Sequence, residues 1–83
     1  MAALTISKRP YTSGLESIKI SGFSDGELNE LKSMEHKEAQ VKLIDMLDSR
    51  NSGIGTSWAR GYGIYGVWFD NEAAYMNIGS SCD

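Results

Sequence analysis

Side chains that could carry out covalent or acid–base chemistry are few in this sequence. Cys82 is the only cysteine and His36 the only histidine, so a nucleophilic site would have to join these two or use His36 to activate a serine. The carboxylate of Asp83, next to Cys82, disfavours a reactive thiolate. One histidine and one cysteine, far apart along the chain, also lack the ligand spacing of zinc sites. We therefore predict no enzyme activity, no catalytic residues, no metal and no cofactor.

One glycine pattern has the literal form of a phosphate-binding loop. Gly61, Gly63 and Gly66 give the spacing G-x-G-x-x-G. In dinucleotide-binding proteins this motif follows a parallel strand and opens a helix. Here the glycines lie between aromatic residues and lead into a strand-forming run, so the context does not favour a nucleotide site.

The aromatic residues offer a different kind of chemistry, which is contact with a partner. Between Gly53 and Gly79 lie six of the eight aromatic residues and six of the nine glycines. Tryptophan, tyrosine and arginine are the residue types most enriched at binding hot spots. The predicted partner-binding residues are Trp58, Arg60, Tyr62, Trp68 and Tyr75.

The second half of this segment is predicted to form a β-hairpin. Val67-Trp68-Phe69 is typical of a strand, and Asp70-Asn71 after it tolerates the positive φ of a two-residue loop. Trp68 would then face Ala73, and Tyr75 would cover Gly66. Because side chains alternate along strands, a core face would hold Tyr65, Val67, Phe69, Ala74, Met76 and Ile78. The opposite face would hold Ile64, Gly66, Trp68, Ala73, Tyr75 and Asn77.

A further strand is predicted just before the hairpin. Trp58, Arg60 and Tyr62 occupy alternate positions, so in a strand they would point to the same face, and the residues between them are small. Strands near 54–60, 63–69 and 72–78 would form a three-strand meander.

Upstream residues supply the elements that must support this meander. Ser24-Asp25-Gly26-Glu27 matches a helical capping box. The apolar stripe of the following helical segment consists of Ala39, Leu43, Met46 and Leu47. Whether residues 24–50 form one helix or two stays open. Ile18 and Ile20 alternate as in a strand over 15–23, and residues 1–14 would be an edge strand or a solvated arm.

These elements predict one α+β domain over residues 1–83. Its small antiparallel sheet has the order β-α-β-β-β with a C-terminal three-strand meander, and one or two helices pack on one face. The acidic net charge of −3 lacks the basic footprint of a duplex-binding protein. No apolar run reaches the ~20 residues that cross a bilayer, and the N-terminal residues do not resemble a secretion signal. With a single cysteine, we expect a cytoplasmic protein without a membrane partner.

Helices with one apolar stripe can cover only one face of such a sheet. We therefore expect a non-enzymatic protein-binding domain that inhibits or regulates a partner through its aromatic sheet face. Its acidic helical side would steer it toward a basic partner. One class with these properties is the phage- or mobile-element-encoded inhibitor of a host nucleic-acid-handling machine.

Three alternatives stay open. The rings could stack the bases of a single-stranded nucleic acid. Arg60-Gly61-Tyr62-Gly63 matches the opening of the RNA-recognition-motif signature, although the positions that follow do not. The aromatic patch could join two copies into a homodimer, or the rings could seal a second small core under the N-terminal arm.

Overall fold

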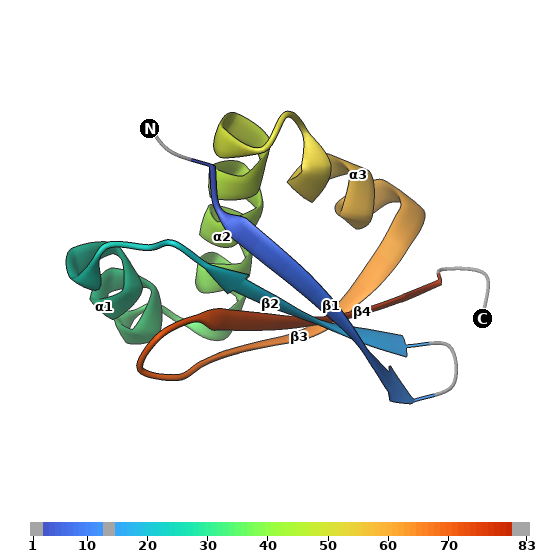
Figure 1. The fold of residues 1–83 in the computed structure, drawn as a ribbon, viewed down its shortest axis with the longest axis horizontal. Helices are drawn as coiled ribbons and strands as arrows, with labels where there is room; N and C mark the ends of the chain where they lie inside the picture. Colours follow the sequence, from blue (N-terminus) through green and yellow to red (C-terminus); the bar gives the residue numbers. More distant parts are fainter. Residues whose placement is uncertain (1–2, 13–14, 81–83) are drawn as a thin grey trace.

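The computed structural model describes residues 3–12 and 15–80. Figure 1 shows two β-hairpins with a helical layer between them in the sequence. The elements are β1 (Thr5–Thr12), β2 (Leu15–Ser21), α1 (Asp25–Ser33), α2 (His36–Arg50), α3 (Ile54–Gly61), β3 (Tyr62–Phe69) and β4 (Ala74–Ser80).

The four strands of the described residues form one antiparallel sheet in the order β1-β2-β4-β3. The two hairpins join where β2 pairs with β4, with Ile18 opposite Met76 and Ile20 opposite Ala74. β1 and β3 are the edges. The predicted α+β class with a small antiparallel sheet is therefore confirmed, and the N-terminal segment is an edge strand rather than an arm.

The main core lies between one face of the sheet and the helices (Figure 1). Ile18, Ile20, Met76 and Ile78 come from the two central strands and are almost completely buried. The predicted stripe of α2 faces them, with Leu43 and Leu47 fully buried. Burying a large aliphatic side chain contributes about 1.5–3 kcal/mol, so this layer contact dominates the stability of the fold.

Residues 24–50 form two helices, which resolves the alternative left open by the sequence. The capping box of α1 is present: the Glu27 amide donates to Ser24 Oγ and the Ser24 amide to Glu27 Oε1. Met34 and Glu35, both in extended conformation, separate α1 from α2.

The predicted strand near 54–60, and with it the three-strand meander, is wrong. These residues form helix α3. Ser52 and Gly53 adopt positive φ and turn the chain after α2. The carboxylate of Asp48 then accepts from both the amide and the hydroxyl of Thr56, in the first turn of α3. Ile54 and Trp58 are four residues apart and face the core together, so the true period is helical.

Gly55 allows α3 to lie directly against α2. A Cβ atom at this position would be 2.5 Å from the backbone oxygen of Ile44 and 3.1 Å from Cβ of Leu47. A backbone oxygen cannot move aside as a flexible side chain can, so the two helices would have to separate.

We expect Gly55→Ala to destabilise the protein by about 1–3 kcal/mol through overpacking. Gly61→Ala in the same helix is the matched control, because no atom lies within 4 Å of its added Cβ. That control should be neutral or stabilising by up to about 1 kcal/mol. Urea unfolding of both variants measures the difference, and equal stabilities would contradict the close helix contact.

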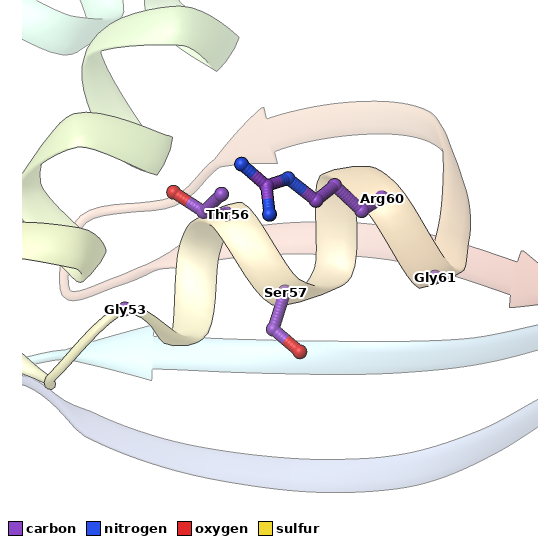
Figure 2. Close-up of a pocket in the computed structure, with 5 residues that line it drawn as sticks. All are labelled: Gly53, Thr56, Ser57, Arg60 and Gly61. Atoms are coloured by element: carbon purple, nitrogen blue, oxygen red, sulfur yellow. The ribbon is translucent and has the colours of Figure 1, made fainter.

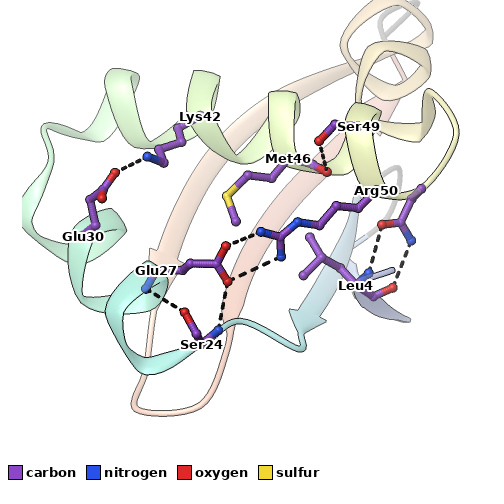
Figure 3. A network of polar contacts seen from close by, with 9 residues as sticks. Leu4, Ser24, Glu27, Glu30, Lys42, Met46, Ser49 and Arg50 are labelled. Carbon is purple, nitrogen blue, oxygen red and sulfur yellow. Dashed lines mark hydrogen bonds and ion pairs between the residues drawn. The ribbon is translucent and has the colours of Figure 1, made fainter. Parts of the chain in front are cut away.

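Polar contacts connect the start of α1, the end of α2 and the beginning of the first strand (Figure 3). The nearly buried guanidinium of Arg50 pairs with the carboxylate of Glu27. Next to it, the Asn51 side chain accepts from the Leu4 amide at 3.0 Å and donates to the Leu4 carbonyl at 2.9 Å. The chain between β2 and α1 is thereby held against the end of α2.

The hydrogen bond from Arg50, followed by the one from the Ser24 amide, lowers the pKa of Glu27 from 4.5 to about 2. A carboxyl group with a depressed folded-state pKa stabilises the fold above its unfolded pKa. This contribution is complete above pH 4.5 and is lost as the pH falls toward 2.

Glu27→Gln should therefore be less stable than the wild type at neutral pH, and the difference should shrink between pH 4.5 and pH 2. Urea unfolding at a series of pH values measures it. Glu30→Gln is the control, because the Glu30–Lys42 pair is exposed and such pairs contribute little. A difference that does not change with pH would contradict the assignment to Glu27.

Candidate partner-binding face

The β3–β4 ribbon has its turn one residue later than the sequence indicated. Trp68 pairs with Tyr75, and Phe69 with Ala74, whereas the predicted pairs were Trp68 with Ala73 and Gly66 with Tyr75. The turn is centred on Asn71 and Glu72 because Asp70 acts as an acceptor before it. Asp70 Oδ1 accepts from the amides of Glu72 and Ala73 at 2.8 Å each, which is an aspartate-initiated turn.

This shift moves the register by two residues, so the alternation of side chains next to the turn is kept. Ala73, predicted on the face opposite the core, is nevertheless completely buried. Val67, Ala74, Met76 and Ile78 lie in the core, as predicted. A bulge between Ile64 and Gly66 then changes the alternation. Ile64 pairs with Ile78 and packs against the core, so its predicted place on the opposite face is wrong. The predicted core position of the Tyr65 side chain lies outside the described part of the structure.

The face turned away from the helices carries a distinctive set of side chains, which we call the open face. From the strand registers, it consists of Thr5, Ser7, Ser17, Lys19, Ser21, Gly66, Trp68, Tyr75 and Asn77. None of these residues is buried, whereas Ile18, Ile20 and Met76 on the core face of the central strands are completely buried. The open face consists of small polar side chains and one lysine around one aromatic pair.

Trp68 and Tyr75 form that pair. Their ring centroids are 5.4 Å apart and their planes differ by 9°, so the rings stack across neighbouring strands. Trp68 remains 43% exposed. The Tyr75 hydroxyl donates to Asp70 Oδ2 at 2.7 Å. The rings are therefore held rigidly at the surface, and they do not seal a second core.

The carboxylate of Asp70 organises this end of the face. The hydrogen bond from Tyr75, followed by those from the Glu72 and Ala73 amides, lowers the pKa of Asp70. The charge of Lys19, which lies opposite Tyr75 in the register, acts in the same direction. Asp70 is therefore ionised at neutral pH while it orients the ring beside Trp68.

The other predicted binding residues do not join this pair. Trp58 is 7% exposed and belongs to the main core, packed there by α3, so its predicted place on the aromatic face is wrong. Arg60 is exposed on α3. Tyr62 begins β3, and its side chain lies outside the described part of the structure.

Arg60 instead lines an open depression of about 670 Å³ along α3, together with Gly53, Thr56, Ser57 and Gly61 (Figure 2). Its charge helps to lower the pKa of Asp48, whose main causes are the two hydrogen bonds from Thr56. The described contacts of this depression stabilise the start of α3, and they do not include a catalytic arrangement.

Lys19, Ser17 and Ser21 also lie on this face and were not predicted as binding residues. The alternation of Ile18 and Ile20 did place Lys19 and Ser21 on the other side of β2, which was the available signal. What it lacked was the pairing of β2 with β4, which brings Lys19 beside Tyr75.

Comparisons with known proteins gave no assignment: no family model, no curated protein and no solved structure matched the chain. In the described residues, no group of three or more histidine, cysteine or acidic side chains is placed to hold a metal ion. None of the helices described is long and apolar enough to cross a bilayer.

Asp70→Ala should lower the melting temperature more than Tyr75→Phe. The first change removes the acceptor of three hydrogen bonds at the turn, and the second removes only one of them. Thermal unfolding followed by circular dichroism measures both variants. If Tyr75→Phe proved as damaging as Asp70→Ala, the turn would not depend on the backbone bonds to Asp70.

Proposed function

We propose that this chain is a non-enzymatic protein-binding domain that inhibits or regulates a partner protein in the cytoplasm. The observation that carries the proposal is the exposed Trp68 ring, stacked on the half-buried Tyr75, on a sheet face that none of the described helices covers. Hot-spot residues of this type bind strongly when a rigid frame presents them, because little side-chain entropy is lost on binding.

The composition around the pair supports protein recognition in particular. Antibody paratopes are enriched in tyrosine, serine, glycine and asparagine, with tryptophan at hot spots. The open face has a similar mixture, with Ser7, Ser17 and Asn77 on the same side of the sheet as the two rings. Rings supply contact area and the small polar groups supply hydrogen bonds that adapt to the partner.

The environment of the single histidine supports a non-enzymatic role. His36 Nε2 accepts from the Val67 amide at 3.3 Å, on the free edge of β3. This contact occupies the ring nitrogen that a general base would need. It also covers an unpaired strand donor, which is a structural use for the residue.

Affinity capture from the native host tests the proposal. We expect Trp68→Ala to lose at least about 30-fold in affinity for the captured protein, the effect of removing a hot-spot residue. Val41→Ala is the matched control, because Val41 is a 59% exposed apolar residue on α2 and should not affect capture. Equal capture by wild type and Trp68→Ala would contradict the proposal.

Gly66→Glu is a second, independent test of the same face. Gly66 neighbours the aromatic pair on the open face, and an added Cβ meets no atom within 4 Å. A glutamate there should leave the fold intact and block the partner. We expect the melting temperature to stay unchanged and the partner protein to be lost from the capture. Unchanged capture would exclude contact of the partner with the centre of this face.

Single-stranded nucleic-acid binding is the second candidate, and the position of Lys19 opposite Tyr75 favours it. A cation beside stacked rings could contact a phosphate while a base stacks on Trp68. Titration with labelled poly-dT and poly-rU at low salt tests this function, and an absence of binding there would eliminate it.

A further inference from the structure

We propose that the free ring face of Trp68 binds an arginine side chain of the partner protein, with Glu72 supplying the opposite charge. This inference rests on the proposed function and specifies the chemistry of the partner. It follows from three properties of the ribbon: the direction of the stack, the distribution of charge and the hydrogen-bonding groups at the turn.

The stack has one open end. Tyr75 on β4 covers one side of the Trp68 ring. β3 is an edge strand of the described sheet, and its outer edge is contacted by His36 at the Val67 amide. No described strand therefore continues the stack beyond Trp68. The 9° angle between the planes means that a third flat group can continue the stack parallel to both rings.

Charge at this end of the sheet selects a cation. Residues 62–80 contain Asp70 and Glu72 and no lysine, arginine or histidine. The Glu72 side chain is exposed and lies in the turn itself, four residues after Trp68. Lys19 lies on the far side of Tyr75 in the register, and its charge acts on Asp70. Glu72 is therefore the acidic group that attracts a cation to the open end of the stack.

Guanidinium fits these conditions better than ammonium does. It is planar, carries a permanent charge, stacks on aromatic faces and donates several N–H groups in one plane. Asp70 already accepts three hydrogen bonds from its own turn, so it contributes charge rather than a free acceptor. The Glu72 carboxylate makes no hydrogen bond or ion pair among the described residues, which leaves it available to the guanidinium.

Titration with short peptides, followed by NMR, tests the inference. The probe is N-acetyl-Gly-Arg-Gly-amide, and the readout is the indole N–H signal of Trp68, assigned by its absence from Trp68→Phe. We expect a saturable shift with the arginine peptide and weaker binding of the same peptide with lysine. The citrulline peptide, which is planar but uncharged, should bind more weakly still.

Glu72→Gln should weaken the affinity for the arginine peptide about two- to fivefold, which is the range expected when an exposed ion pair is lost. Glu30→Gln, on α1, is the matched control and should leave the affinity unchanged. Equal binding of the arginine and citrulline peptides, or no shift at the Trp68 indole with any of them, would overturn the inference.

The two proposals fail separately. If the peptides do not bind but Trp68→Ala still abolishes capture of the partner, the open face binds protein by other means and only the arginine assignment is wrong. If neither peptides nor capture depend on Trp68, the proposed function is wrong as well. If oligo-dT shifts the Trp68 indole signal and no peptide does, the result would support the nucleic-acid alternative and would also overturn the inference.

Discussion

The packing of a helical layer on one face of a four-stranded sheet is the contact on which the rest of this structure depends. Ile18, Ile20, Met76 and Ile78 meet Leu43 and Leu47 of α2 and exclude water between the layers. Each helix buries a single apolar stripe, so the helices can cover only one face of the sheet. The opposite face is left to small polar side chains and to the Trp68–Tyr75 pair, whose exposure is a direct result of one-sided packing.

Much of this arrangement could be predicted from the sequence. The capping box at Ser24, the stripe through Leu43 and Leu47, and the alternation of Ile18 and Ile20 are local patterns, and each formed as predicted. The outward direction of Trp68 also follows from alternation, because an error of two residues in the register does not change the face of a side chain.

The predictions that failed depended on contacts that a local pattern does not contain. Residues 54–60 have small residues at alternate positions, which imitates a strand. Their helix is fixed by Asp48 from α2 and by the fit of Gly55 against Ile44. Likewise, the turn was misplaced because Asp70 was assumed to be a loop residue, whereas its carboxylate is the acceptor that closes the turn. The bulge near Ile64 gave no signal beyond the glycines around it.

The order of the strands has a consequence for how the chain is made. β2 completes its hydrogen bonding only through β4, which is the last described element of the chain. Pairing of two strands that are so far apart in the sequence has a large entropic cost of loop closure, and it forms slowly. Until then, the apolar strand that holds Ile18 and Ile20 has an unpaired inner edge, open to wrong pairing with other chains. During synthesis, a strand from the centre of the finished sheet thus waits for β4 with one edge exposed to wrong pairing.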